Sequence, residues 1–232
     1  MKTALIILGL SLCLPAVGAD KDKPLPKDFK SLKVIAEKGD AEAQFRLASN
    51  FYYGEGVKKD YGQSFKWAFL SAAQGNPKAQ YRLARLYSSG RGVLRDEKKA
   101  DALFKESFRG LINLARQNDS KAQYNLGQMY RLNRGVEIDE REAVKWYRKS
   151  AEQGYPNAQH NLGVMYGMGK GVEQNYVTAY AWASIAAANG EVLAAKFRSE
   201  FLEKKMTAED ISKAQELSKE MLKKNPKLIK KP

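Results

Sequence analysis

The sequence predicts an all-α solenoid, in which repeated helix pairs stack in series between further helices at both ends. Three markers predict this fold because they recur along the chain with one spacing. An Ala-Gln pair begins at residues 43, 79, 122 and 158, and a Gly-x-Gly-Val run begins at residues 54, 90, 133 and 169, with Asn as its first residue in the third copy. A bulky apolar residue then stands at Trp67, Leu103, Trp146 and Trp182. Successive copies of every marker are separated by 36, 43 and 36 residues, which indicates four copies of one unit.

The chain begins with a segment typical of a secretory signal peptide, which we assign to residues 1–19. Lys2 supplies a positive start, an apolar run covers residues 3–14, and small residues at 17–19 form a cleavage site. The run is about a dozen residues long, whereas a bilayer span needs about 20; an uncleaved N-terminal anchor is the alternative. Cys13, the only cysteine, lies in this segment and follows Leu12 instead of the small residue of a lipid-attachment site. We therefore expect a mature protein without disulfides, in the periplasm or outside the cell.

Each unit is predicted to contain two helices. The first helix carries an apolar stripe, such as Ala43, Leu47 and Phe51, and ends at the glycines because they adopt left-handed backbone angles at low cost. The second helix starts after a side chain that accepts the free amide protons of a first turn. The start residues are Asp60, Asp96, Asp139 and Asn175, and the end residues are Gly75, Asn118, Gly154 and Gly190. The units then span about residues 40–75, 76–118, 119–154 and 155–190.

The longer interval of 43 residues predicts one longer helix. The seven extra residues fall between Leu103 and Ala122, inside the second helix of the second unit. Seven residues make close to two helical turns, so the apolar face keeps its direction. We therefore expect residues 102–115 to lie in a helix that projects past its neighbours, with Gly110 as a mild weakness.

The solenoid is expected to cover residues 28–205 and to carry helical caps. Residues 28–38 read as a lone second helix before the first unit, and residues 191–204 as one more first helix after the last unit. A capping box at Thr207 starts a C-terminal capping helix within residues 206–224. Residues 20–27 and the basic tail 225–232 are Lys- and Pro-rich, so we expect both to be disordered. The lysines of the tail either keep the protein soluble or make weak contact with an anionic envelope surface.

The repeated pattern resembles the Sel-one-like repeat (SLR) family, a branch of the tetratricopeptide-like solenoids. The pattern reads Ala-Gln-x-x-Leu-[Ala/Gly]-x-x-[Tyr/Phe]-x-x-Gly-x-Gly-Val, then x-x-Asp, and later Trp-x-x-x-[Ala/Ser]-Ala-x-x-Gly; Asn133 and Leu103 depart from it. The resemblance implies a right-handed α-α superhelix of four SLR helix pairs that binds partners through its concave face. Exported members include regulators, envelope scaffolds and immunity proteins against type VI phospholipase effectors. A cysteine-rich branch is described as penicillin-binding or β-lactamase-like, but it carries disulfides that this mature chain lacks.

No residue pattern indicates catalysis, a metal site or a cofactor. His160, the only histidine, occupies the position of Phe45, Tyr81 and Tyr124 in the other units, so we expect it to fill a ring-shaped slot. One histidine without a thiol cannot supply the usual zinc ligands. The regular spacing of the tryptophans favours core packing over a stacking platform. We therefore expect a non-enzymatic protein, with an enzyme acting on cell walls or β-lactams as the alternative.

The surface indicates a protein partner. The net charge of +14 favours an acidic partner, and export makes nucleic acid an unsuitable one. Positions that change from unit to unit on the first helices are free to recognise a partner, and Tyr and Arg are enriched at binding hot spots. The predicted partner-binding residues are Arg46, Tyr52, Tyr81, Arg82, Arg85, Tyr124, Gln128 and Arg131. A merely solvated face is the alternative, and the free protein is expected to be a monomer. Two roles stay open, an immunity protein and an envelope regulator or scaffold.

Overall fold

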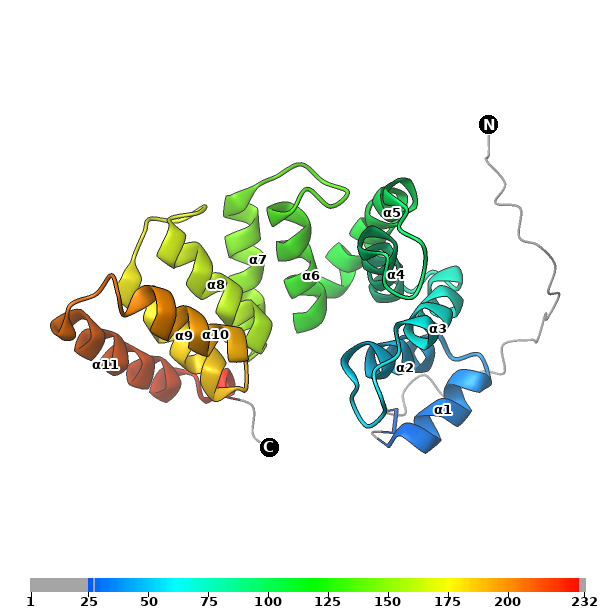
Figure 1. Ribbon diagram of the computed structural model, residues 1–232, viewed down its shortest axis with the longest axis horizontal. Helices are drawn as coiled ribbons and strands as arrows, with labels where there is room; N and C mark the ends of the chain where they lie inside the picture. Colours follow the sequence, from blue (N-terminus) through cyan, green and yellow to red (C-terminus); the bar gives the residue numbers. More distant parts are fainter. Residues whose placement is uncertain (1–24, 27, 230–232) are drawn as a thin grey trace.

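The computed structural model describes residues 25–26 and 28–229, and this part of the chain folds into helices without a strand (Figure 1). The α-helices are α1 (Phe29–Glu37), α2 (Ala41–Tyr53), α3 (Tyr61–Ala73), α4 (Pro77–Ser89), α5 (Glu97–Arg116), α6 (Ser120–Arg131), α7 (Glu140–Glu152), α8 (Pro156–Met168), α9 (Tyr176–Ala188), α10 (Val192–Lys196) and α11 (Ala208–Lys224). A π-helix (Phe197–Leu202) and a 3-10 helix (Pro226–Leu228) complete the set. The predicted all-α solenoid is confirmed. The predicted signal peptide lies outside the described residues.

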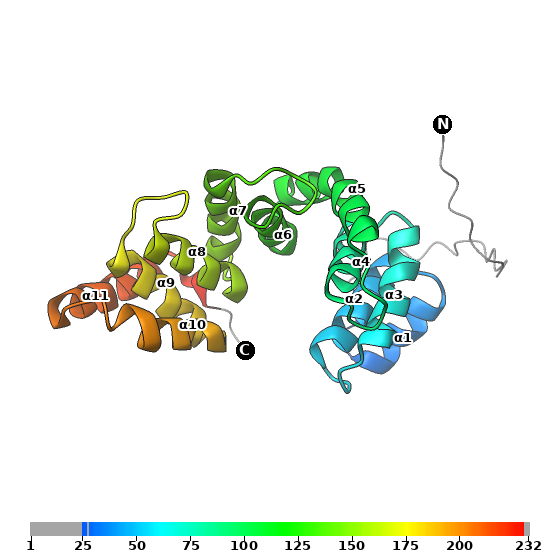
Figure 2. The same cartoon turned by 45° about the horizontal axis from the view of Figure 1, so that its top comes forward.

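The helix pairs follow one another along an arch (Figure 2). The pairs α2/α3, α4/α5, α6/α7 and α8/α9 correspond to the four predicted units. One limb of the arch carries α1 to α4 and the other carries α8 to α11, and the space between the limbs is open on one side. Because successive helices pack against one another along the chain, the fold presents one long inner face built from successive repeats.

The predicted helix starts are confirmed by side-chain caps. Asp60, Asp96 and Asp139 each accept the amide proton of the residue three positions later at 2.9 Å, and Asn175 does so at 2.8 Å. Thr207 and Asp210 form the capping box at the start of α11. These bonds satisfy amide groups that a helix leaves unpaired in its first turn.

The glutamine of the Ala-Gln pair joins each unit to the one before it. Three of these glutamines donate from Nε2 to a carbonyl at the end of the preceding second helix: Gln44 to Ala36 (3.1 Å), Gln123 to Ala115 (3.0 Å) and Gln159 to Ala151 (3.2 Å). Their Oε1 atoms accept an amide proton from Gln74, Gln153 and Asn189 at 2.6–2.8 Å. Gln80 instead donates to Glu106 on the longer α5 (2.7 Å). Since a buried amide is costly unless it is hydrogen-bonded, these contacts explain why the repeat carries glutamine.

Replacing Gln123 by leucine is expected to lower the free energy of unfolding by about 2–3 kcal/mol. The substitution keeps the volume but removes two hydrogen bonds, the one from Gln123 Nε2 to the carbonyl of Ala115 and the one that Gln123 Oε1 accepts from Gln153. Urea denaturation followed by circular dichroism measures the change. Gln215→Leu, at an exposed position of α11, is the control and should cost less than about 0.5 kcal/mol.

Helix α5 is 20 residues long, whereas α3, α7 and α9 have 13, which confirms the prediction of one longer helix. In the second, third and fourth units, the second glycine of the loop shows where the unit docks on the one before it. Gly92 packs on Tyr61 and Gly171 on Glu140, the first residues of α3 and α7, but Gly135 packs on Phe104 and Lys105, well inside α5. The third unit is therefore shifted by seven residues along α5, and the first two turns of α5 project beyond it.

Residues 225–229 are ordered, so the expectation of disorder was wrong for them; residues 230–232 lie outside the described part of the chain. Leu228 is buried, and its carbonyl accepts protons from Gln159 Nε2 (2.8 Å) and Asn189 Nδ2 (2.6 Å). Asn225 Nδ2 donates to the carbonyl of Glu152 (2.9 Å). The segment thus lies against the end of α7, the first turn of α8 and the C-cap of α9. Charge alone suggested a solvated tail, but the apolar pair Leu228-Ile229 supplies a docking contact.

Candidate functional site

The tryptophans and His160 belong to the packed interior, as the sequence predicted. Trp67, Trp146 and Trp182 are only 7–8% exposed and lie between helices. His160 is half-buried and meets the ring of Phe197 edge-on, with centroids 6.1 Å apart. Burial lowers the pKa of His160, so the imidazole is neutral at pH 7. These residues stabilise the stack and leave the inner face of the first helices as the candidate site.

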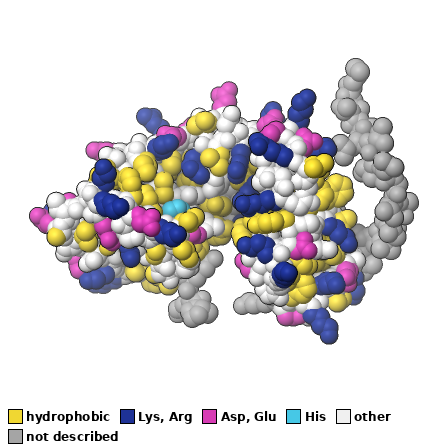
Figure 3. Space-filling model, in the orientation of Figure 1, with side chains coloured by type: hydrophobic (Ala, Val, Ile, Leu, Met, Phe, Trp, Pro, Cys, Tyr) yellow, Lys and Arg dark blue, Asp and Glu magenta, His cyan; other side chains and the backbone are white. Residues whose placement is uncertain are grey.

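A small pocket on the first helices forms the centre of the candidate site, and we call it the Arg/Tyr pocket. Its lining comes from α2, α4 and α6 and from the residues just before α8: Phe45, Tyr53, Lys78, Tyr81, Arg82, Arg85, Lys121, Tyr124, Asn125 and Tyr155. Basic and hydrophobic side chains gather around the hollow between the two limbs of the arch (Figure 3). The solenoid therefore brings residues of four successive units to one place, although they lie far apart in the sequence.

Arg82 is the most deeply buried cation of the pocket, at 4% exposure. Its guanidinium lies over the rings of Tyr52 and Tyr53, 4.3 and 4.9 Å from their centroids. Nη2 donates weakly to Ser49 Oγ and to the Tyr53 hydroxyl, both at 3.4 Å. Nη1 is buried and has no hydrogen-bond partner in the described part of the chain. An Arg donor left in this way is unusual, because buried polar groups are nearly always paired.

Tyr52 holds further arginines by its hydroxyl. Arg85 Nη2 donates to Tyr52 Oη at 3.2 Å, and Arg91 Nη1 donates to the same oxygen at 2.9 Å. Tyr52 itself is only 7% exposed, so it orients the arginines and is not available to a partner. Its neighbour Tyr53 is 39% exposed and faces the pocket. Tyr53 therefore lines the pocket in place of the predicted Tyr52, because the helix phase alone did not fix which of the two rings faces it.

Two lysines extend the positive charge across the pocket. The Nζ atoms of Lys78 and Lys121 lie 5.4 and 5.3 Å from the centroid of the Phe45 ring. Lys78 is paired with Glu42 (3.1 Å) and Asp119 (3.4 Å). Burial, and then the charge of Arg82, lower the pKa of the Lys121 ammonium. The pocket thus holds more positive charge than its own acidic residues offset.

The tyrosine hydroxyls respond to this environment in different ways. Burial tends to raise the pKa of the Tyr53 hydroxyl, but the adjacent Arg82 and Arg85 outweigh it and leave the pKa below its ordinary value. Burial and the neighbouring Tyr81 raise the pKa of Tyr124 to about 12, and Tyr124 Oη accepts from Gln128 Nε2 at 2.8 Å. The positive charge of the arginines therefore outweighs burial at Tyr53 but not at Tyr124.

The structure brings together only part of the predicted binding set. Tyr81, Arg82, Arg85 and Tyr124 line the pocket. Gln128 is 8% exposed, and Arg131 bonds to Gln128 and to the Tyr147 hydroxyl, so both lie beside the pocket and support it. Arg46 is exposed outside the pocket, near Glu42 at 3.7 Å. Tyr53, Lys78, Lys121 and Tyr155 line the pocket but were missed, although Lys78 and Lys121 each stand one residue before an Ala-Gln pair.

Four segments of the chain match the model of the Sel1 repeat family: residues 41–76, 77–107, 120–155 and 156–191. The chain belongs to the Sel1 repeat family. The match to the second unit ends at residue 107, inside α5, where the longer helix departs from the repeat. The SLR resemblance predicted from the sequence is therefore confirmed.

This Sel1 repeat protein is similar to c5321, a protective antigen of uropathogenic Escherichia coli with an SLR fold, at 31% identity over 86% of this chain and 49% of that chain, with a TM-score of 0.50. It is also similar to a Sel1 repeat protein from Oxalobacter formigenes (32% identity, 74% and 48% coverage, TM-score 0.46). The immunity protein Pa5087 from Pseudomonas aeruginosa shares 20% identity over 81% of each chain, with a TM-score of 0.44. The chain spans about half the length of the first two proteins. No curated protein matches it.

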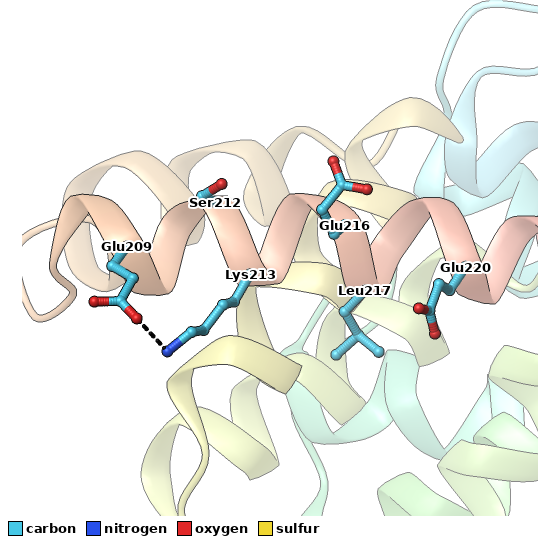
Figure 4. A pocket seen from close by; sticks show the side chains of 6 residues that line it. All are labelled: Glu209, Ser212, Lys213, Glu216, Leu217 and Glu220. Carbon is cyan, nitrogen blue, oxygen red and sulfur yellow. Dashed lines mark ion pairs between the residues drawn. The ribbon is translucent and has the colours of Figure 1, made fainter.

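Other surfaces of this Sel1 repeat protein offer less chemistry. Figure 4 shows a shallow face of α11, where Glu209 pairs with Lys213 at 2.7 Å and Glu216 and Glu220 point outward. Their charges pair along the same helix, as on any solvated helix face. Within the described residues, no group of three His, Cys, Asp or Glu side chains is placed to hold a metal. Over the same part of the chain, no helix has the length and hydrophobicity needed to cross a bilayer.

Proposed function

We propose that this Sel1 repeat protein is a non-enzymatic, exported interaction module that binds one protein partner on the inner face of its arch. The observation that carries the proposal is the Arg/Tyr pocket, which three successive first helices build together. Arg82, Arg85 and Lys121 lie there without an ion pair in the described part of the chain, and Tyr53 and Tyr124 stand among them. Aromatic and arginine side chains clustered in a hollow are the composition of a binding hot spot.

An acidic partner surface would complement this charge. Glu42 and Asp119 both form ion pairs with Lys78. Glu55 favours the charged form of Lys121, but its effect on the pKa is the smallest of those that act on this lysine. Positive charge not offset within the protein speeds encounter with a negative surface and disfavours basic partners. We propose that the protein works in the periplasm or outside the cell, because the start of the sequence has the features of a signal peptide.

Two roles fit a groove of this kind. As an immunity protein, the chain would cover the active surface of a secreted toxic effector, such as a type VI phospholipase. As an envelope regulator or scaffold, it would hold a partner in place without blocking an activity. The immunity role rests on the range of functions in the family and not on the geometry, which serves both roles equally.

Affinity capture of the purified protein in an envelope extract tests the proposed function. We expect one protein to be enriched by the wild type and to be lost when Arg85 is changed to Glu. The captured protein is then expressed alone in the periplasm of a host cell. Growth arrest that co-expression of this chain relieves would identify an immunity protein, and normal growth would indicate a scaffold. If no protein is enriched at low salt, the proposed function is wrong.

A further inference from the structure

We propose that the Arg/Tyr pocket receives the side-chain carboxylate of an Asp or Glu residue that the partner presents, and that this carboxylate bonds to Nη1 of Arg82. The inference deepens the proposed function and rests on it, because it names the chemical group that the partner must offer. The inference rests on Nη1 of Arg82, which is unpaired among the residues that the structure describes, and the neighbouring side chains explain why the missing acceptor would be a carboxylate.

The guanidinium of Arg82 is fixed in place but incompletely used. Its Cζ atom lies 4.3 and 4.9 Å from the ring centroids of Tyr52 and Tyr53, and Nη2 donates to Ser49 Oγ and to the Tyr53 hydroxyl. The edge that carries Nη1 is left without an acceptor among the described residues, although Arg82 is 96% buried (4% exposed). An arginine held in this way is preorganised, so a ligand that supplies the missing acceptor does not have to order the side chain.

The surroundings favour an anion over a neutral acceptor. Arg85 and Lys121 line the same pocket, and neither has an acidic partner in the described part of the chain. Lys121 is itself held in an unfavourable place, because burial and the charge of Arg82 act against its ammonium ion. An incoming negative charge would relieve this repulsion and pair with both cations, as charge-assisted hydrogen bonds are the strong ones.

The walls of the pocket favour a flat and narrow anion. The rings of Phe45, Tyr81 and Tyr124 line it, and little free space remains between them. A carboxylate on a flexible side chain is planar and matches the edge of a guanidinium. A phosphate is tetrahedral and bulkier, so we expect it to bind less well. Since Nη1 is covered in the free protein, we expect the side chain of Tyr53 or Lys121 to move aside as the carboxylate enters.

Four probes test the inference by NMR titration of the purified protein, with the guanidinium signals of Arg82 as the readout. The first is the blocked tripeptide acetyl-Gly-Glu-Gly-amide, which offers only a side-chain carboxylate. Acetyl-Gly-Gln-Gly-amide is the neutral control, acetyl-Gly-Gln-Gly with a free C-terminus offers a main-chain carboxylate, and inorganic phosphate offers the other common anion. We expect the Glu peptide to shift the Arg82 signals in a saturable manner, with an affinity at least fivefold higher than that of any other probe.

Three variants show whether the binding occurs in the pocket. Arg82→Met removes the donor and should weaken binding of the Glu peptide at least tenfold; the backbone amide signals of Arg85 and Lys121 are the readout for this variant, because the Arg82 guanidinium signals are then absent. Lys121→Glu, at a part-buried position, places a carboxylate beside Arg82 and should weaken binding of the Glu peptide to the same extent. Arg46→Met is the matched control, because Arg46 is exposed outside the pocket, and should stay within twofold of the wild type.

The outcomes separate this inference from the proposed function. Equal binding of the Glu and Gln peptides, tighter binding of phosphate or of the free C-terminus, or no effect of Lys121→Glu would each overturn the carboxylate assignment. If a protein is captured from the envelope extract while the Glu peptide fails to bind, the proposed function stands and this inference falls. If the Glu peptide binds but no protein is captured, the carboxylate site stands and the proposal of a protein partner is wrong.

Discussion

Replacing Gly92 by alanine is expected to lower the free energy of unfolding by about 3–5 kcal/mol. Gly92 has a φ of +71°, and a Cβ atom built on it would lie 2.2 Å from the carbonyl oxygen of Tyr61. That oxygen belongs to the first turn of α3, so it cannot move without disturbing the helix. The alanine would therefore push the second unit away from the first, and the contact between the two units would be lost.

The matched control is Gly56→Ala, at the same position of the first unit. Gly56 has a φ of +70°, but nothing lies within 4 Å of a Cβ atom there. Its substitution carries only the cost of the left-handed backbone, about 1–2 kcal/mol. Chemical denaturation of both variants measures the difference. Equal losses of unfolding free energy in the two variants would mean that Gly92 is needed only for the conformation of its own loop. The contact between Gly92 and the first unit would then contribute nothing to stability.

Reversing the charge of Arg85 and Lys121 to Glu is expected to weaken partner binding about 100-fold, equivalent to about 3 kcal/mol. Both cations line the Arg/Tyr pocket, and acidic replacements would repel the acidic surface that the pocket is proposed to meet. Neither residue is fully buried, so we expect the variant to keep its helical circular dichroism spectrum. Titration calorimetry with the captured partner measures the change.

The control for this variant is Lys66→Glu with Lys98→Glu. Both lysines are exposed on second helices, α3 and α5, and the double variant changes the net charge by the same amount. We expect its affinity to stay within about threefold of the wild type, since exposed charges away from an interface act only through the screened long-range field. A loss as large as that of the pocket variant would show that net charge, and not the pocket, governs binding.

The repeated helix pairs could be predicted from the sequence, since the start, the end and the buried face of each helix are set by local chemistry. The Asp and Asn caps, the left-handed glycines and the apolar stripes act within a few residues, so the sequence displays them directly. The C-terminal segment could not be predicted in the same way. Leu228 docks on helices far away in the sequence, and its neighbours Lys227 and Lys230 made the segment look solvated.

The position of the Arg/Tyr pocket was predictable in outline, but not all the residues that line it. Comparison of units located the inner face and identified Arg82, Arg85 and Tyr124. It could not tell Tyr52 from Tyr53, because the side chain that faces the pocket depends on how Arg82 and Arg85 stack on the neighbouring unit. It also missed Tyr155, which reaches the pocket from the start of the next unit.

Site-specific photo-crosslinking tests the central claim most directly, because it reports which face of the arch meets the partner. A photoreactive phenylalanine replaces either Tyr53, on α2 in the pocket, or Phe69, on α3. The two sites are matched, since both are aromatic and they are 39% and 37% exposed. We predict a crosslink to the captured partner from position 53 and none from position 69. A crosslink from position 69 alone would contradict a partner bound on the inner face.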